Sequence, residues 1–385
     1  MKKRHIWIAV AIASFFSYTS QSVALVFKQK MNILMVVPTF PKIHDVCMLN
    51  QITGLIDRGH NVTIFAPRRG DVTKVQEDVT KYNLLAKTIY EELPSNLNQF
   101  DIVVFQLGHK ALDIKRTHNY KGKVVICLRG YDITCFLKNN PQWYDQFFET
   151  CDLFMPVCEV FKNILEGIGC HPDKIIVHHS AIDCSRFIFR QKERSIDGAI
   201  KIISAGRFVE KKGFEYAIRA IAMLVKKYPR LQYTIIGEGK LKANYVRLIK
   251  QLKAQKNITL QDWHAHDEYI KILTEADIFV LPSVTAQNND QEGIPNVLKE
   301  AMAIGLIVVA TDHSGNSELI KNGEYGFLVQ ERNRDAIYRA IDYVIRNPDQ
   351  WVPMQLAARR KIESKFNREK ENDSLEKIFL RLLKK

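Results

Sequence analysis

Several common motifs are missing from this chain of 385 residues, and each absence excludes a class of function. No Gly-x-Gly-x-x-Gly follows the first predicted strand at 32–37, which argues against a nicotinamide or flavin site. The chain has no zinc-finger spacing, no RNP-like aromatic motif and no dense basic helix, so we expect no nucleic-acid partner. No Asp-x-Asp element stands where a divalent metal would bridge phosphates. We therefore expect neither a metal nor a cofactor.

Cysteine is confined to the N-terminal half of the chain. The seven cysteines lie between Cys47 and Cys184, their number is odd, and no Cys-x-x-Cys pair occurs. Several fall in apolar runs, as Cys127 does within 124–128. Buried, reduced thiols are the expected state, which favours the cytoplasm.

Positive charge exceeds negative charge by 14. Residues 1–30 hold five basic side chains and no acidic ones, which leaves +9 for the rest of the chain. Scattered lysines on solvated faces would explain part of this excess. Attraction to an anionic membrane surface would explain the remainder, and it is the interpretation that we favour.

The N-terminal segment, residues 1–30, is open to three interpretations. A basic start precedes an apolar run from Ile6 to Phe16, and Ser22-Val23-Ala24 has the small-x-small pattern of a cleavage site, as in a signal peptide. The apolar run is short for a membrane span. An uncleaved anchor and an upstream extension of the reading frame are the alternatives. We expect the folded body to lie in the cytoplasm, peripheral to the inner face of the membrane.

Apolar runs alternate with helical patterns through both halves of the chain, and hydrophobic residues make up 46% of it. Runs rich in Val and Ile predict parallel strands that are covered on both faces. We predict strands at 32–37, 61–65, 101–105, 123–128, 152–157, 174–178, 200–205, 232–236, 257–260, 277–281, 306–310 and 327–329. We predict helices near 47–59, 213–227, 241–254, 315–321 and 333–346. A charged stretch at 190–197 indicates a linker between two α/β domains.

Two glutamates eight positions apart, Glu292 and Glu300, enclose the segment Gly-Ile-Pro-Asn-Val-Leu-Lys. Strand-like residues 278–281 precede this segment, and a second strand at 306–310 follows it. The first turn of a helix that begins here would present free N–H groups and a positive dipole end to a diphosphate. Glu300, one turn inside, would accept hydrogen bonds from a ribose diol, although a solvated helix face is the alternative. A nucleotide-sugar fits this arrangement.

With this Glu-x7-Glu motif, the chain resembles the retaining nucleotide-sugar glycosyltransferases of the GT-B fold, glycosyltransferase family 4. The resemblance extends to Gly-Arg-Phe-Val-Glu-Lys-Lys-Gly at 206–213. It implies that Arg207 and Lys212 bind the donor diphosphate together with Gly293, Ile294 and Asn296. It also implies that Glu292 is catalytic and positions the sugar, and that Glu300 binds the ribose. No metal is implied.

The N-terminal half resembles a bacterial subset of this family that builds exopolysaccharide or lipopolysaccharide-type glycans, as in colanic acid biosynthesis. Residues 40–62 and 172–183 carry that likeness. Arg129 stands where the family often has a histidine that contacts the reacting sugar, and Gln106 stands where related chains tend to have another. We therefore name Arg129 and His109 as catalytic candidates and Asp132 as an acceptor-binding or orienting residue. An Arg129–Asp132 ion pair and a surface His109 are the alternatives.

The resemblance implies an α/β protein of the GT-B fold, in which two Rossmann-like domains face each other across a cleft. We predict an acceptor domain at 31–190, a nucleotide-sugar domain at 198–348, and helices at 349–385 that cross back to the first domain. The implied enzyme is a hexosyltransferase that uses a nucleotide-diphosphate sugar and a glycan or lipid-linked acceptor. A nucleotide-sugar 2-epimerase and a non-catalytic binding module are the alternatives.

Overall fold

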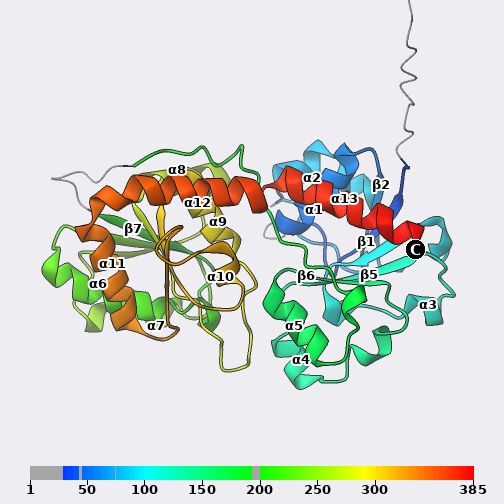
Figure 1. Ribbon diagram of the computed structural model, residues 1–385, viewed down its shortest axis with the longest axis horizontal. Coiled ribbons are helices and arrows are strands. Elements are labelled where there is room, and N and C mark those ends of the chain that lie inside the picture. The colour runs from blue at the N-terminus through cyan, green and yellow to red at the C-terminus, as the bar shows by residue number, and fades with distance from the viewer. Residues whose placement is uncertain (1–28, 43–45, 74, 193–199) are drawn as a thin grey trace, which may run out of the picture.

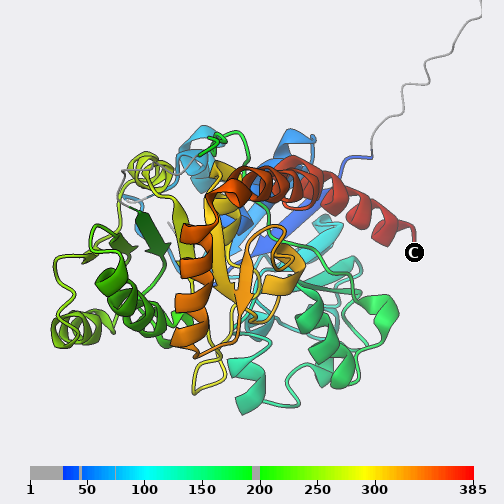
Figure 2. The same ribbon diagram turned by 60° about the vertical axis from the view of Figure 1, so that its left-hand side comes forward.

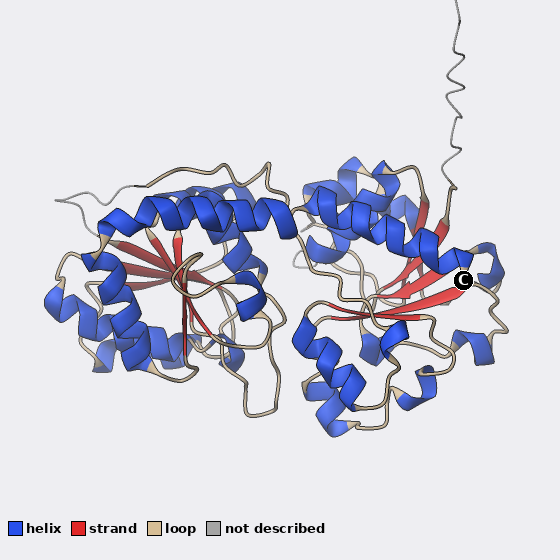
Figure 3. Ribbon diagram, in the orientation of Figure 1, coloured by secondary structure: helices blue, strands red, loops and turns tan. Residues whose placement is uncertain are grey.

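The computed structural model describes residues 29–42, 46–73, 75–192 and 200–385. The predicted signal or anchor segment lies almost entirely outside these ranges, as does most of the predicted linker. The described residues form two six-stranded sheets, each with helices on both faces (Figures 1 and 3). The predicted α/β architecture with parallel sheets is confirmed.

The first sheet has the strand order β3-β2-β1-β4-β5-β6, and all its neighbouring strands pair in parallel. Its strands are β1 Asn32–Val36, β2 Asn61–Ala66, β3 Thr88–Tyr90, β4 Ile102–Phe105, β5 Lys123–Leu128 and β6 Leu153–Pro156. The helices of this half are α1 Val46–Asp57, α2 Glu77–Lys81, α3 Ile114–Thr117, α4 Cys135–Asn139 and α5 Glu159–Gly167.

The second sheet has the order β12-β11-β10-β7-β8-β9, again with parallel neighbours. Its strands are β7 Lys201–Ala205, β8 Gln232–Ile236, β9 Ile258–Gln261, β10 Ile278–Leu281, β11 Ile307–Thr311 and β12 Phe327–Val329. Its helices are α6 Phe214–Lys227, α7 Lys242–Gln251, α8 His266–Glu275, α9 Asn296–Ile304, α10 Asn316–Leu319 and α11 Arg334–Arg346.

Both sheets follow one connection pattern. Numbered within each half, the strands run 3-2-1-4-5-6, so the direction of winding reverses between β1 and β4 and again between β7 and β10. Crevices outside the carboxyl ends of strands at such reversal points are where open α/β sheets bind ligands. The fold therefore places two candidate binding edges in one molecule.

The central strands are buried over their whole length, which explains their composition. Every residue of β4, β10 and β11 is buried, and these strands consist almost entirely of Val, Ile, Leu, Phe and Ala. Helices cover both faces, so these strands leave little room for polar side chains, and Thr311 at the end of β11 is the polar residue among them. This continuous apolar character is the pattern from which the strands were predicted.

Two C-terminal helices join the halves. Helix α12 (Trp351–Lys365) packs against α9, and α13 (Arg368–Lys384) packs against α1, so the pair lies along one side of both domains in both views (Figures 1 and 2). Leu375 and Phe379 of α13 are buried in the core of the first domain beside Ile52. Arg58 adds an ion pair to Asp373 at 2.6 Å. The chain therefore ends as part of the domain in which it began.

The structure differs from the prediction at both edges of the first sheet. The short strand β3 was not predicted, because only three residues pair there and none of them is buried. The strand predicted at 174–178 is wrong. These residues run beside β6, where Ile176 and His178 donate backbone hydrogen bonds to Phe154 and Pro156, and the chain then leaves the sheet to cross between the domains. Among the helices that the structure describes, none is both long and apolar enough to cross a membrane.

Candidate active site

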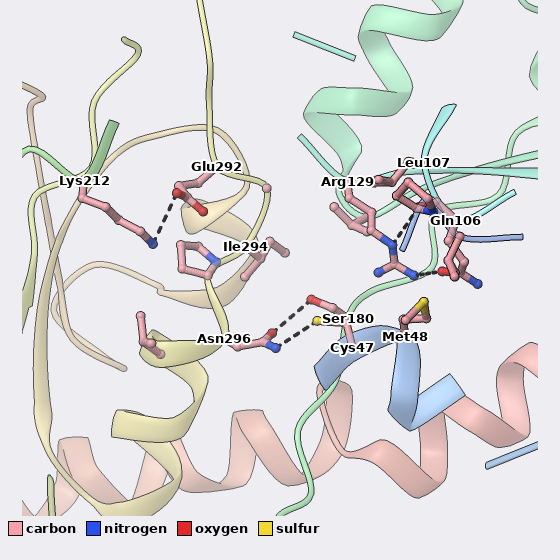
Figure 4. A pocket seen from close by; sticks show the side chains of 16 residues that line it. Cys47, Met48, Gln106, Leu107, Arg129, Ser180, Lys212, Glu292, Ile294 and Asn296 are labelled. Atoms are coloured by element: carbon pink, nitrogen blue, oxygen red, sulfur yellow. Dashed lines mark hydrogen bonds and ion pairs between the residues drawn. The ribbon is translucent and has the colours of Figure 1, made fainter. Parts of the chain in front are cut away.

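A pocket of about 310 Å³ lies between the two halves. Segments that follow β1, β4 and β5 line one wall, and the loop before α9 lines the other (Figure 4). The lining residues are Val37, Pro38, Cys47, Met48, Gln106, Leu107, Arg129, Val157, Ser180, Lys212, Glu292, Gly293, Ile294, Pro295, Asn296 and Val297. The binding edge of the first sheet thus faces the Glu-x7-Glu segment of the second half.

Glu292 is held between two lysines. Its Oε1 atom lies 3.3 Å from Nζ of Lys212 and 3.6 Å from Nζ of Lys211. Burial alone would raise the pKa of Glu292, but the two ammonium groups outweigh it and lower the pKa to about 2. Lys211 also pairs with Asp290 at 3.0 Å. The carboxylate is therefore ionised at any physiological pH and faces the pocket.

The backbone of Glu292 has its own support. Its N–H donates to Nε2 of His313 at 3.1 Å, and Nδ1 of His313 contacts Glu331 at 2.5 Å. The carboxylate of Glu331 also accepts a hydrogen bond from the N–H of Thr285. These contacts join the loop before α9 to the segments that follow β11 and β12. The position of Glu292 thus depends on three loops at one edge of the second sheet.

Helix α9 begins at the pocket with an open first turn. Pro295 occupies its N-cap position, and no side chain caps the turn. The N–H groups of a free helix N-terminus favour an anion. Gly293 is needed just before it, because a Cβ atom there would lie 2.6 Å from Val157 of the first domain. The two halves therefore approach each other closely at the predicted diphosphate-binding loop.

The side chain of Asn296 joins the two halves. Its Nδ2 donates to Sγ of Cys47 at 3.0 Å, and its Oδ1 accepts from Oγ of Ser180 at 3.2 Å. Nζ of Lys299, whose side chain is completely buried, donates to the same Oδ1 and to the carbonyl oxygen of Ser180. In this conformation the amide group of Asn296 is bonded to residues on both sides of the pocket.

Arg129 faces Glu292 from the first domain (Figure 4). Its Nε donates to the carbonyl oxygen of Gln106 at 3.2 Å, and its Nη2 donates to the side-chain oxygens of Gln51 and Gln106. These bonds place a cation in the wall of the pocket. Gln106 thus holds Arg129.

Asp132 organises the loops around Arg129. Its carboxylate accepts hydrogen bonds from the backbone N–H groups of Gly108, Arg129, Gly130 and Ile133. The predicted alternative, a side-chain ion pair between Arg129 and Asp132, is not found in the described structure; the contact is made through the backbone of Arg129. Asp132 is buried and outside the pocket lining, so the structure gives it an orienting position.

The structure leaves His109 outside the pocket lining. Its ring packs against Tyr131 and Phe136, with centroid separations of 5.3 Å and 5.4 Å. Burial lowers the pKa of His109, and its Nδ1 has no hydrogen-bond partner among the described residues. The ring of His109 belongs to an aromatic cluster. His109 lies shortly after Gln106, which binds Arg129, but its side chain does not line the pocket with Arg129.

Two other predicted donor ligands, Arg207 for the diphosphate and Glu300 for the ribose, lie outside this pocket lining. Arg207 follows β7 and is exposed, outside the pocket lining, whereas Lys212 of the same segment is buried. Glu300 lines a separate small cavity with His266 and Arg186. Burial raises the pKa of Glu300 to about 7, although Tyr269 donates a hydrogen bond to it at 3.0 Å. Helix α9 therefore contributes to two neighbouring cavities.

Some residues of the site were not predicted from the sequence. Lys211 was missed although it precedes Lys212, and Gln51, Cys47, Ser180 and His313 carry no motif by which they could be found. Among the described residues, no cluster of three or more His, Cys, Asp or Glu side chains is placed to hold a metal ion. The chemistry of this site is that of fixed cations, one carboxylate and a helix N-terminus, which suits a phosphorylated ligand with a polar head.

Two Rossmann-like domains with facing binding edges form the GT-B architecture, and comparisons with known proteins agree. The sequence model of the glycosyl transferases group 1 family matches residues 185–363. Amylovoran biosynthesis glycosyltransferase AmsK of Erwinia amylovora is 30% identical over 398 aligned positions, which cover 89% of this chain and 98% of that protein. The putative colanic acid biosynthesis glycosyltransferase WcaL of Escherichia coli is 29% identical and covers 87% of this chain and 96% of its own length.

Solved structures show the same fold. HepE of Anabaena, crystallised with UDP, has a TM-score of 0.75 at 15% identity and covers 91% of this chain and 100% of its own. A glycosyltransferase of Rickettsia africae has a TM-score of 0.74 at 20% identity, over 92% of this chain and 99% of its own. The chain belongs to the group 1 glycosyltransferases and is therefore an enzyme of the transferase class.

Proposed function

We propose that this enzyme transfers a hexose-type sugar from a nucleotide-diphosphate donor to a glycan or lipid-linked acceptor during synthesis of a cell-surface polysaccharide, with retention of anomeric configuration. The observation that carries the proposal is Glu292, a carboxylate kept ionised by Lys211 and Lys212 beside the open start of α9. The names of AmsK and WcaL support a role in polysaccharide synthesis. The complexes of HepE with UDP and UDP-glucose support a nucleotide-sugar as the donor.

In the proposed reaction the donor diphosphate lies at the start of α9 beside Lys212. Glu292 accepts hydrogen bonds from hydroxyls of the donor sugar. An acceptor hydroxyl oxygen attacks C1 of that sugar as the bond from C1 to the diphosphate oxygen breaks, and the hydroxyl proton passes to the departing phosphate. Because negative charge grows on the diphosphate in the transition state, fixed cations at this place lower the barrier.

Glu300 is the proposed ribose ligand, and the cavity that it lines with His266 would take the nucleoside. Asn296 and Ser180 make their interdomain hydrogen bond between this helix and the crossing segment. For one ligand to occupy both cavities, we expect the domains to separate, bind the donor and close again. Closure would exclude water, which would otherwise compete with the acceptor.

The cations of the site also suggest that the reaction needs no divalent metal. Lys212 and the N-terminus of α9 on one side and Arg129 on the other would carry the charge that a metal carries elsewhere. We expect the transfer rate to remain within twofold in the presence of EDTA, and a rate restored only by added Mg²⁺ or Mn²⁺ would contradict this.

Binding and turnover together test the proposed function. The full chain is first screened by thermal shift against UDP, GDP, ADP and their sugar conjugates; a ligand at a hundred times its Kd adds about 2.7 kcal/mol to the free energy of unfolding. The donor so found is then incubated with lipid-linked and free glycan acceptors. An α-configured donor should give an α-linked product by NMR. Nucleotide binding without transfer would contradict the enzyme reaction, and an isomerised donor would indicate an epimerase.

We also propose that the enzyme meets its acceptor at an anionic membrane surface, as the net charge of +14 suggests. Sedimentation with vesicles that contain about 30% anionic lipid should carry the protein down at low salt and release it at high salt, since the attraction is screened. Equal sedimentation with neutral vesicles would contradict this.

A further inference from the structure

A chain of buried hydrogen bonds runs from the backbone of α13 to the wall of the pocket. The carbonyl oxygen of Glu371 in α13 contacts Nε2 of His178 at 3.0 Å. Nδ1 of His178 contacts Nε2 of Gln51 at 3.3 Å, and Oε1 of Gln51 accepts from Nη2 of Arg129 at 3.0 Å. His178 and Gln51 are both buried. Three segments far apart in the sequence thus meet behind Arg129.

The direction of every bond in this chain follows from its first member. A carbonyl oxygen only accepts, so Nε2 of His178 carries the hydrogen. Burial lowers the pKa of His178 to about 4, and the ring is therefore neutral with a lone pair on Nδ1. The amide nitrogen of Gln51 must then face His178. A reversed amide would place its NH₂ group against the guanidinium, donor against donor.

The groups around His178 shift its pKa in both directions, and burial outweighs the contact with Glu371, which raises it. The carboxylate of Glu371 lies 3.7 Å from Nε2, on the side of α13. The guanidinium of Arg129 and the neighbouring His179 both lower the pKa of His178, from the first domain and from the crossing segment. Arg129 therefore faces the end of a hydrogen-bond chain that keeps one orientation across the neutral pH range.

We infer that His178 is a positioning residue for the transfer reaction, which through Gln51 holds Arg129 in the orientation that meets the leaving diphosphate. This inference rests on the proposed function, because it assigns Arg129 to the donor. Arg129 uses Nε and Nη2 for its hydrogen bonds within the described protein, which leaves Nη1 to a ligand. Since the outer end of the chain is the backbone of α13, the docking of that helix acts on the reaction through Arg129.

Kinetics of single and double variants test the inference. His178→Phe should lower kcat about 10-fold or more, the scale for misplacing a group at the reacting centre. The Kd for the nucleotide alone should stay within twofold, because the second domain binds it. In an Arg129→Ala background, His178→Phe should cause no further loss of kcat. Equal losses in both backgrounds would overturn the inference. His171→Phe, at an exposed position, is the matched control.

Nuclear magnetic resonance gives a second test that needs no turnover. In the wild-type protein the ¹⁵N shifts of His178 should show hydrogen on Nε2 and none on Nδ1, without change between pH 6 and 8. Gln51→Glu places a carboxylate against Nδ1, so this variant should raise the pKa of His178 into the measured range. A wild-type ring that titrates near 6.5, or that carries hydrogen on Nδ1, would overturn the inference. If transfer itself is absent but the ring behaves as expected, the proposed function has failed and not the hydrogen-bond chain.

Discussion

Oε1 of Glu292 lies 3.3 Å from Nζ of Lys212, and the two side chains are 15% and 10% exposed. A carboxylate in such a place would normally take up a proton. Two lysines prevent this and keep its pKa at about 2, although burial also lowers the pKa of Lys212. A sugar diphosphate has a partner for each group: its hydroxyls can donate to the carboxylate, and its diphosphate can pair with the lysines.

Glu292→Gln should lower kcat about 100-fold, the scale for the loss of one preorganised electrostatic partner. The amide keeps the shape of the side chain but removes the charge that faces the sugar. Initial rates of sugar transfer measure the effect. Glu324→Gln, which removes a carboxylate from an exposed pair with Lys321, serves as control and should leave the rate unchanged. A Glu292→Gln rate within tenfold of wild type would exclude the assigned role.

Lys212→Ala and Arg207→Ala should differ in their effect on stability. Removal of the buried Lys212 leaves Glu292 with Lys211 as its remaining close cation, so the free energy of unfolding should fall by about 3 kcal/mol, the scale for breaking a buried ion pair. Arg207 is exposed, and its removal should change stability by less than about 0.5 kcal/mol. Denaturant unfolding measures both. Equal losses would show that the segment 206–213 acts as one structural unit.

Nucleotide-sugar binding should tighten with rising pH because of Glu300. Burial raises the pKa of Glu300 in the folded protein to about 7, from an ordinary 4.5. The protonated form therefore contributes to the stability of the folded protein below pH 4.5, and this contribution is lost as the pH rises through 7. The ionised form accepts ribose hydroxyls better. From pH 6 to 7.5 its ionised fraction rises roughly eightfold, and Kd should fall by up to that factor.

Titration calorimetry with a nucleotide-sugar measures this dependence, since its diphosphate does not change charge in that range. Glu300→Gln should bind more weakly at pH 7.5 and lose the pH dependence. A wild-type Kd that is flat between pH 6 and 7.5 would remove Glu300 from the binding site.

Lys299→Met should loosen the contact between the halves. Nζ of Lys299 donates to the carbonyl oxygen of Ser180 at 2.6 Å and to Oδ1 of Asn296 at 3.1 Å, and Met leaves both acceptors without this donor. We expect a loss of about 2 kcal/mol in the free energy of unfolding, the scale for removing hydrogen bonds made by a charged donor. Lys361→Met is the control, because Lys361 also lies over the ring of Phe366 but is less buried. Equal losses would show that contact with the ring, and not the hydrogen bonds, matters.

Phe379→Ala should destabilise the first domain although it lies near the end of the chain. The side chain is completely buried in the core of that domain, and such truncations cost about 3–5 kcal/mol. Leu356→Ala on α12, where the side chain is exposed, should cost less than about 0.5 kcal/mol. Chemical denaturation measures both variants. A small loss at Phe379 would mean that α13 is not part of the cooperative unit of the first domain.

Much of the fold was accessible from local sequence patterns. Runs such as 306–310 are apolar at every position because both faces of a parallel strand are covered, so they predict strands without any knowledge of their neighbours. The edge strand β3 lacks this pattern, and the segment 174–178 has an apolar run but forms no strand. Whether an edge segment pairs depends on where the chain must go next, and that is a property of the whole molecule.

At the site, too, local sequence patterns predicted some residues, and tertiary packing decided the rest. Glu292 and Lys212 belong to local motifs. The family resemblance based on those motifs predicted a nucleotide-sugar as the ligand. Arg207 is exposed, whereas Lys212, five residues later, is buried. His109 packs in an aromatic cluster, although it lies shortly after Gln106, which binds Arg129. Sequence proximity does not determine the direction of a side chain, because that depends on which elements pack around it.

The sequence by itself determined most of the strands, the two-domain order and the Glu-x7-Glu segment, because hydrophobic periodicity and backbone geometry act over a few neighbouring residues. Only the tertiary structure decided that His178, Gln51 and the backbone of Glu371 stand behind Arg129, that Lys299 and Ser180 join the halves, and that burial and charge set the pKa values of Glu292 and Glu300. Those properties arise from atoms that meet in space after the chain has crossed twice between its domains.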